Sequence, residues 1–265
     1  MSEDYLDINR ESWNARTELH FDSEFYDNSS FLKGRSSLNS IELDLLGHVS
    51  GKKILHLQCH FGQDTISLSR MGAKCTGIDL SDTAIEKAKE LAAHSGEDVR
   101  FIASDVYGLE SVLDESFDMV FTTYGTIGWL PDLDKWAGVI DKFLKPGGTF
   151  IFAEFHPVVW MFSNDFSRIE YSYFNRQEIV EESDESYSEG KLMQSVKEVS
   201  WNHDLGEVFE SLLGRDFQIT AFHEFDYSPY SCFKDMVESE PGKFQIKQFA
   251  GKIPLVYSLK AIKPI

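Results

Sequence analysis

One short segment places the strongest constraint on this chain. The apolar run Ile54–Leu57 leads into the sharp turn Gln58–Gly62, which opens a helix, and Asp79 follows the next apolar run. A strand, a turn and a helix N-terminus in this order place backbone N–H groups at the carboxyl end of a strand, where a nucleotide-like ligand binds. An acid at the end of the next strand can bind both ribose hydroxyls. The segment therefore predicts a nucleotide-like binding site at one edge of a parallel sheet.

The rest of the chain strengthens this prediction, because the turn by itself contains only Gly62 of the three glycines that such turns usually have. Apolar runs typical of strands alternate with stretches of helical periodicity. The predicted helices are Gln63–Arg70, a helix capped by Ser81, and Leu133–Phe143. The predicted strands are Lys53–Leu57, Lys74–Ile78, Val99–Ala103, Phe117–Thr122 and Thr149–Phe155. This alternation indicates an α/β fold with a doubly wound, parallel sheet.

The segments outside the alternation complete one domain of 265 residues. We expect residues 1–40 to form an N-terminal cap over the core, because they mix aromatic with charged residues. Residues 41–156 hold the ligand-binding core, and residues 157–203 break the rhythm and are expected to form a small antiparallel insertion. Residues 204–265 end the core.

Several elements of these flanking segments can be predicted separately. A short helix is expected from Asn9 to Leu19, and another begins after Asp204. In the insertion, Ile169–Phe174 alternates like a strand, whereas the acidic stretch Glu178–Glu189 is typical of a solvated loop. The strands Phe217–Phe225 and Leu255–Ile262 are expected to form the last, hairpin-like pair.

The charge balance limits the partners that the protein can bind. Twenty-five Lys and Arg residues stand against 44 Asp and Glu residues, which gives a formal net charge of −19 at pH 7. A field of this sign repels phosphate backbones and anionic membrane surfaces, so we expect neither nucleic acid nor membrane as a partner. Small neutral or cationic substrates are compatible with it.

The cysteines and the N-terminal residues indicate the compartment. Cys59, Cys75 and Cys232 are widely spaced and odd in number, which is typical of unpaired thiols in a reducing cytosol. Met1–Tyr5 lacks the basic and apolar regions of a signal peptide, and no apolar run is long enough to span a bilayer. We therefore expect a cytoplasmic monomer or homodimer. Because the eight histidines are scattered, we expect no metal.

At four positions in the same order, the chain resembles the class I S-adenosylmethionine (SAM)-dependent methyltransferases. Ile54–Gly62 stands where that family has an acid-x-Gly-x-Gly-x-Gly loop, and Asp79 stands where it has the acid that binds ribose. Asp105 matches the acid that meets the adenine amino group. Phe117–Val120 and Leu144–Gly148 match the fourth strand and the turn before the fifth. The resemblance covers roughly residues 40–156.

The resemblance implies a Rossmann-like, seven-stranded, mostly parallel sheet with a C-terminal antiparallel strand pair. It also implies an enzyme that moves a methyl group from SAM to a small-molecule acceptor by in-line displacement and releases S-adenosylhomocysteine (SAH). The residues expected to bind the cofactor are Gln58, Cys59, His60, Gly62, Asp79, Leu80, Ser81, Asp105, Val106, Thr123 and Tyr124.

The chain departs from the family pattern within the first loop. His56 stands where the family usually has an acid, and Gln58 and His60 replace the first two glycines. Glycines at such places allow a positive φ and a close approach of the backbone. Two interpretations stay open: at least one of these side chains contacts the methionine part of the cofactor, or the turn is relaxed and both point away. We predict Gly62 as the residue of close approach.

His156 is the candidate general base, because it follows the fifth predicted strand at the edge that faces the ligand. The alternative is a structural histidine that bonds a backbone carbonyl. We further expect residues 1–40 and 157–203 to form a roof that encloses the acceptor. The aromatic residues of that roof are Trp13, Tyr26, Phe31, Trp160, Phe162 and Trp201.

Two other functions are compatible with the same residues. One is a protein that binds SAM or SAH for regulation, without transfer, and the other is a protein methyltransferase, for which the negative charge would favour a basic target. An enclosed acceptor pocket near the sulfonium distinguishes a small-molecule enzyme from both.

Overall fold

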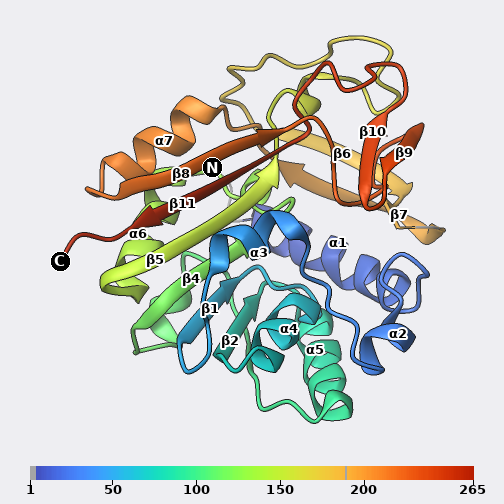
Figure 1. Cartoon of the computed structure of the whole chain (residues 1–265). Helices are drawn as coiled ribbons and strands as arrows, with labels where there is room; N and C mark the ends of the chain where they lie inside the picture. The colour runs from blue at the N-terminus through green and yellow to red at the C-terminus, as the bar shows by residue number, and fades with distance from the viewer. Residues whose placement is uncertain (1–3, 189) are drawn as a thin grey trace.

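The computed structural model describes residues 4–188 and 190–265. The fold is built around a central seven-stranded sheet (Figure 1). The strand order is β3-β2-β1-β4-β5-β11-β8. β11 runs antiparallel to both of its neighbours, and the other pairs are parallel. The strands are β1 Lys53–Leu57, β2 Lys74–Asp79, β3 Arg100–Ala103, β4 Phe117–Thr123, β5 Leu144–Phe155, β8 Gln218–Phe225 and β11 Val256–Ile262. The expected mostly parallel sheet with an antiparallel C-terminal pair is confirmed.

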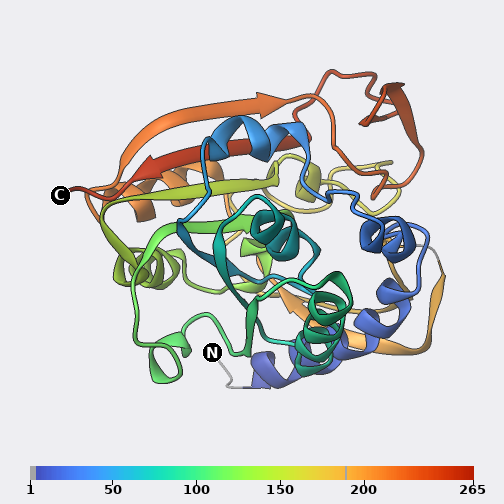
Figure 2. The same cartoon turned by 60° about the horizontal axis from the view of Figure 1, so that its bottom comes forward.

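Helices cover both faces of this sheet (Figure 2). On one face lie α3 Ser40–Leu46, α4 Gln63–Arg70 and α5 Asp82–Ser95, whose apolar residues pack in two clusters with β1, β2 and β3. On the other lie α6 Leu133–Phe143 and α7 Leu205–Leu213, which share a cluster with β4, β5 and β11. Within residues 4–188 and 190–265, no helix is both long and apolar enough to cross a membrane.

The helix ends follow from side-chain capping. The Ser81 hydroxyl accepts the Ala84 N–H at 3.0 Å, so α5 begins where the sequence predicts it. Asp204 caps α7 in the same way by accepting the Glu207 N–H at 2.9 Å. The N-terminal helix is longer than expected, because α1 extends from Asp4 to Phe21.

The insertion contains a hairpin, but in a different place from the predicted one. Its strands are β6 Ile179–Glu185 and β7 Lys191–Ser200. The expectation of a solvated loop for residues 178–189 was therefore wrong in large part, since most of that stretch is β6. Lysines of β7 pair with acids of β6 across the hairpin, which lowers the repulsion within the acidic strand. Ile169–Phe174 forms only one isolated bridge, between Ile169 and Phe162.

A second hairpin, β9 Met236–Glu240 and β10 Lys243–Ile246, lies in the segment between β8 and β11 and was not predicted. Both hairpins, α1 and the short α2 Asn28–Leu32 lie at the end of the sheet toward which the β5 arrow points (Figure 1). Short 3-10 turns complete the described chain at Leu109–Ser111, Ile127–Trp129 and Val159–Met161.

Buried polar side chains attach α1 to the β6–β7 hairpin. The Asn9 amide donates to the Val199 carbonyl at 2.8 Å and accepts the Val199 N–H at 2.9 Å, so it pairs with β7 as another strand would. Arg16 is buried, forms an ion pair with Glu198 at 2.6 Å and donates to the Glu185 carbonyl at 2.7 Å. Because these buried groups find partners across the contact, α1 and the hairpin form one layer.

Candidate functional site

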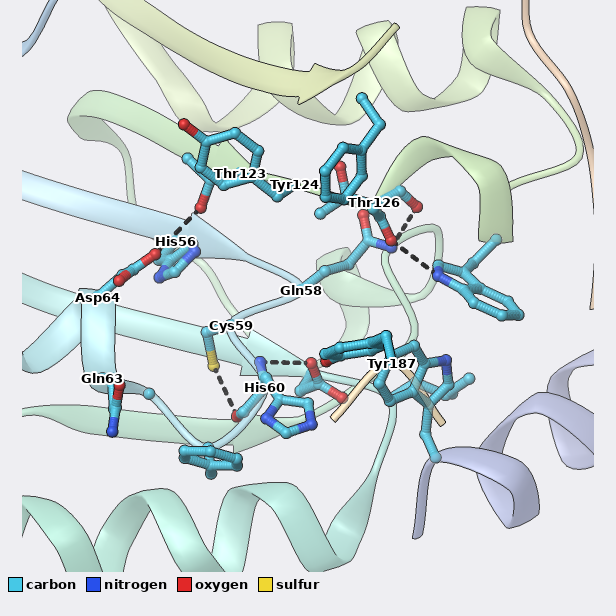
Figure 3. A pocket seen from close by; sticks show the side chains of 18 of the residues that line it. His56, Gln58, Cys59, His60, Gln63, Asp64, Thr123, Tyr124, Thr126 and Tyr187 are labelled. Carbon is cyan, nitrogen blue, oxygen red and sulfur yellow. Dashed lines mark hydrogen bonds between the residues drawn. The ribbon is translucent and has the colours of Figure 1, made fainter. Parts of the chain in front are cut away.

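A cavity of about 320 Å³ lies at the carboxyl ends of β1, β2 and β4 (Figure 3). Its floor consists of the loops that follow these strands, as the pattern of strands and turns predicts. Its sides come from α1, residues 25–37, the segment after β5, the turn of the β6–β7 hairpin and the loop after β8. Ten of the predicted cofactor-binding residues line it: Gln58, Cys59, His60, Gly62, Asp79, Leu80, Asp105, Val106, Thr123 and Tyr124.

The loop after β1 keeps a left-handed backbone without the usual glycines. The φ angles of Gln58, His60 and Gly62 are 55°, 50° and 80°. A left-handed conformation costs a residue with a side chain about 1–2 kcal/mol, so this loop is strained at two positions. The His60 N–H donates to Asp79 Oδ2 at 2.7 Å, which offsets part of that strain. The turn is therefore not relaxed.

The side chains of Gln58 and His60 each leave one polar atom unpartnered. Gln58 Nε2 donates to the Thr126 carbonyl at 2.8 Å, and His60 Nε2 lies 3.2 Å from His20 Nδ1. Gln58 Oε1 and His60 Nδ1 are buried without a hydrogen-bond partner among the described residues. Figure 3 shows the two side chains on opposite sides of the loop, with Gln58 reaching toward Thr126. Because buried polar atoms are rarely left unpaired, these two atoms fit a polar ligand.

Histidines beside this loop are neutral at pH 7. Burial lowers the pKa of His60 well below its usual value and that of His20 to about 3. His56, which replaces the family's acid, lies 2.7 Å by its Nδ1 from the Thr65 hydroxyl, and burial lowers its pKa to about 3. Each of these rings can donate one hydrogen bond and accept another but adds no charge to the cavity.

Gly62 lines the cavity, but the space that a side chain would need at this position lies in the core. A Cβ on this residue would lie 2.6 Å from Phe101 Cζ and 3.2 Å from the Cβ of Ala88. Only glycine allows β3 and α5 to pack so closely here, and its φ of 80° adds a second reason. Cys59 is also mostly buried, and burial raises the pKa of its thiol well above the usual value.

Two acids stand at the ends of β2 and β3. Asp79 accepts the N–H of His60 at 2.7 Å and that of Ser81 at 2.9 Å, and burial raises its pKa to about 6. Asp105 accepts two N–H groups of its own turn, from Tyr107 at 3.1 Å and Gly108 at 2.7 Å. Each carboxylate keeps acceptor capacity toward the cavity. Ser81 does not line the cavity; it is fully buried and donates to Asn14 Oδ1 at 2.6 Å.

The loop after β4 is held by Glu154, a residue whose role sequence reasoning missed. Its carboxylate accepts the N–H groups of Gly125, Thr126, Ile127 and Phe155 and the Thr126 hydroxyl. This loop too has left-handed residues, with φ of 47° at Tyr124 and 72° at Gly125. Glu154 is 2% exposed and lies outside the cavity. The available signal was an isolated acid within the apolar run Phe150–Phe155.

A third acid, Asp64 of α4, lies at the other end of the cavity. Asp64 accepts the hydroxyl of Ser37 at 2.5 Å and that of Thr123 at 3.2 Å, as Figure 3 shows for Thr123. Burial raises the pKa of Asp64, and the Arg35 guanidinium opposes that rise. Arg35 also lines the cavity and donates to the Tyr26 carbonyl at 2.7 Å.

Aromatic residues form most of the remaining wall. Of the six aromatic residues predicted for the roof, three line the cavity: Trp13, Tyr26 and Trp160. The other three, Phe31, Phe162 and Trp201, pack elsewhere in the protein. Tyr230 and Phe233 were not foreseen. β8 and β5 both pair antiparallel with β11, so they run in the same direction and the loop after β8 lies at the ligand-binding edge of the sheet. This strand direction is the signal that could have located Tyr230 and Phe233. The aromatic lining residues are Tyr5, Trp13, Phe25, Tyr26, Phe61, Tyr124, Trp129, Phe155, Trp160, Tyr187, Tyr230 and Phe233.

His156 does not lie with these residues. It is 3% exposed and absent from the cavity wall. Its Nε2 lies 3.0 Å from Glu224 Oε1, and its Nδ1 accepts the Val158 N–H at 3.2 Å. This geometry fits the alternative, a structural histidine, better than a general base. Its partners are the Glu224 carboxylate and the Val158 N–H group, not the backbone carbonyl that the alternative expected. Within residues 4–188 and 190–265, no group of three or more potential ligands could hold a metal ion.

Comparison with known proteins identifies relatives of this arrangement. Residues 48–211 match the family described as methyltransferase domain. A ubiquinone biosynthesis O-methyltransferase of Chromobacterium violaceum is 27% identical over 133 residues, which cover 49% of this chain and only 57% of that protein. The chain thus spans little more than half the length of this curated relative.

Solved structures share the fold at low sequence identity. A SAM-dependent methyltransferase from Mesorhizobium loti is similar with a TM-score of 0.57 at 18% identity, over 88% of this chain and all of that one. The structure of a DhpI–SAH complex is similar with a TM-score of 0.58 at 16% identity, over the full length of both chains. Because identity is below 20% in both, these likenesses concern the fold.

Proposed function

This chain belongs to the methyltransferase domain family, and we propose that it is an enzyme that transfers a methyl group from SAM to a small-molecule acceptor. One observation carries the proposal. The cavity brings Asp79, which has unused acceptor capacity, together with the unpartnered atoms Gln58 Oε1 and His60 Nδ1. These groups fit a ligand that has a ribose and a polar amino-acid end.

Each part of the cofactor has residues that would hold it. Asp79 would bind the ribose hydroxyls, and Leu80, Asp105 and Val106 would surround the adenine. Thr123, Tyr124 and the two unpartnered atoms would face the methionine part, with Arg35 available for its carboxylate. Cys59, Gly62 and Ser81 would act through the backbone and packing of the loops that they shape. When bound, SAM supplies an electrophilic methyl group on a sulfonium.

The protein's own contribution to methyl transfer is mainly orientation and exclusion of water. An in-line displacement needs the acceptor atom on the far side of the methyl carbon, and effective molarity rises steeply when both are held in place. The aromatic wall supports this role, since it would hold a compact acceptor and displace water from the reacting atoms. A cavity with so many aromatic lining residues favours a small molecule over a protein acceptor.

The proposal is tested by binding and turnover measured on the same preparation. Calorimetry should detect SAM binding, and SAH should be released when pools of metabolites are supplied as acceptors. Binding without SAH release in any pool would favour the regulatory alternative. No binding of SAM or SAH would reject the proposed site altogether.

A pair of aromatic variants tests the wall. Trp160 is 39% exposed and lines the cavity, whereas Phe174 is 70% exposed and lies outside it. Trp160→Ala should reduce turnover while SAM affinity is kept, because its ring packs against Phe155 and Phe233, neither of which is a predicted cofactor-binding residue. Phe174→Ala should change neither. Equal turnover by both variants would contradict an acceptor wall at Trp160.

A further inference from the structure

A hydrogen bond at the cavity wall connects Tyr124, which would face the methionine part of the cofactor, with a buried carboxylate that has no role in the proposal above. Tyr124, whose ring lines the cavity, donates its hydroxyl to Glu42 Oε2 at 2.8 Å. Glu42 belongs to α3 and is 0% exposed. A fully buried carboxylate is expensive to keep unless charge or hydrogen bonds compensate it. Its surroundings therefore indicate what the pair can do.

Hydrogen-bond donors surround Glu42, but positive charge does not. Asn39 donates to Glu42 Oε1 from its backbone N–H at 2.8 Å and from its amide at 3.1 Å, and the same amide donates to the Tyr230 hydroxyl at 2.7 Å. Among the ion pairs of residues 4–188 and 190–265, none involves Glu42. Asp64 adds negative charge nearby. The carboxylate is thus held in place without a cation to keep it ionised.

These surroundings leave Glu42 balanced between its two protonation states. Burial and the charge of Asp64 raise its pKa, while the bonds from Asn39 and Tyr124 oppose the rise, so the pKa lies at about 7. The other groups that face the pair are Tyr230, whose pKa burial raises well above the usual value, and Arg35, which acts on Asp64. A base with a pKa near the working pH is the most effective kind.

The position of Tyr124 is fixed from both sides. Its φ of 47° is strained for a residue with a side chain, and the Glu154 carboxylate holds the following turn through three consecutive N–H groups. Its ring packs edge-on against Tyr230 at 5.3 Å. A strained residue that its surroundings hold so firmly at a cavity is typical of a functional position. Tyr124 is therefore rigid where it meets a ligand.

We propose that Tyr124 and Glu42 form the proton acceptor for a hydroxyl-bearing small molecule, such as a phenol. The acceptor hydroxyl gives its proton to the Tyr124 oxygen as Tyr124 passes its own proton to Glu42 Oε2. The freed electron pair of the acceptor oxygen forms the bond to the methyl carbon, and the electrons of the broken carbon–sulfur bond stay on sulfur. The negative charge of Glu42 and the positive charge of the sulfonium disappear together, so neither group carries a charge after the transfer.

This inference rests on the proposed function, but its first test needs no turnover. Infrared difference spectra of the full chain should show a protonated carboxyl band that disappears as the pH rises through the region of pH 7. The band should be missing in Glu42→Gln. In Tyr124→Phe it should persist to higher pH, because the carboxylate loses a donor that stabilises its charged form.

Two variants control for the other groups. Tyr187→Phe removes a phenol that lines the same cavity but bonds the Tyr26 hydroxyl, and it should leave the band where it is. Asp64→Asn should lower the pH at which the band disappears, because a negative charge is removed. A Glu42 band that is present at all pH values between about 5 and 9, or at none of them, would overturn the proposal, since such a group cannot exchange a proton near neutrality.

Turnover gives the second test, with catechol and phenol as acceptors and SAH release as the signal. Glu42→Gln should lower the rate near neutral pH about 10²–10⁴-fold and flatten its pH profile, with SAM affinity unchanged. An unchanged profile in Glu42→Gln would overturn the inference while leaving the proposed function intact. Failure of the wild type to bind SAM would reject the proposed function instead, and the infrared result would still decide the ionisation of Glu42.

Discussion

Two carboxylates, each near the end of a strand, hold the two strained loops of this site, and they do so differently. Glu154 of β5 accepts five hydrogen bonds, holds the loop after β4 and lies outside the cavity. Asp79 of β2 accepts the N–H groups of His60 and Ser81 and lines the cavity. A carboxylate saturated with internal donors stabilises the protein, whereas one with spare acceptor capacity can bind a ligand. The number of donors, together with the partial exposure of Asp79, thus separates the two acids.

Removal of the saturated carboxylate should have the largest effect on stability. Glu154→Ala should lower the free energy of unfolding by about 3–5 kcal/mol, because each buried donor left without an acceptor costs about 1–3 kcal/mol and part of the loop can adjust. Urea denaturation measures this change. Glu154→Gln, which keeps one acceptor oxygen, should lose less. An unchanged urea midpoint in Glu154→Ala would remove the basis of the comparison.

Removal of the unsaturated carboxylate should instead affect binding. Asp79→Ala should weaken SAM binding by roughly 1.5–3 kcal/mol, which is typical of lost charge-assisted hydrogen bonds. Its stability should fall less than that of Glu154→Ala, since water in the cavity can satisfy the freed N–H groups. Calorimetry with Asp98→Ala as the control, an exposed acid outside the cavity, separates local contact from net charge. Equal SAM affinity in both variants would mean that the site is misplaced.

The pH dependence of binding and stability should sharpen the same contrast. Burial raises the pKa of Asp79 from 3.8 to about 6, so the folded protein takes up this proton at a higher pH than the unfolded chain does. The contribution of Asp79 to stability is therefore greatest below pH 3.8 and is lost as the pH rises through 6. SAM affinity should change in the opposite direction and fall as the pH drops below 6, because ribose binding needs the carboxylate.

Asp79→Asn provides the control for that experiment. It removes the titrating group but keeps one acceptor oxygen, so both pH dependences should become flatter in parallel. If the affinity of Asp79→Asn still falls at acid pH as in the wild type, another group is responsible.

The smallest expected effect concerns the strained loop that Asp79 holds. Gln58→Gly should change the free energy of unfolding by less than about 1 kcal/mol, because relief of the left-handed strain offsets the lost bond to Thr126. Gln58→Ala keeps the strain and should be about 1 kcal/mol less stable than the glycine variant in urea. Both should bind SAM more weakly than the wild type. Equal stability of the two variants would mean that the loop stores no strain.

A cofactor-bound structure tests the side chains of this loop directly. We predict that Gln58 or His60 contacts the methionine part of SAM. If both side chains lay more than about 5 Å from it, beyond any hydrogen bond, the prediction would fail.

The core could be predicted from the sequence because its signals are local. Lys53–Leu57 and Gln63–Arg70 have the predicted bounds, since a buried strand and the helix after it carry their own apolar patterns. The β6–β7 hairpin could not be located in the same way. Its position depends on contacts with α1 through Asn9 and Arg16, residues far away in the sequence that no local pattern connects to it.

The sequence predicts at which strand ends the site lies, but not which side chains point into it. Asp79 follows from the spacing after β1, and it lines the cavity. Along β5, however, neighbouring residues alternate between faces, so Phe155 lines the cavity while Glu154 and His156 do not. To judge His156 as a base, one must know which face of the sheet its side chain lies on, as well as the edge of the sheet at which the residue lies. Glu154 was missed because its partners come from a loop that folds back onto it.

The bond between Gln58 and the Thr126 carbonyl has a consequence for the order of events during a catalytic cycle. One amide side chain connects the loop that would grip the cofactor with the loop that carries Tyr124 toward the acceptor. A molecule that binds Gln58 Oε1 would also restrict the rotation of its Nε2 end, and through it the Thr126 loop. We therefore expect the cofactor to enter first and the acceptor second, because only the loaded protein presents a fully ordered surface to the acceptor.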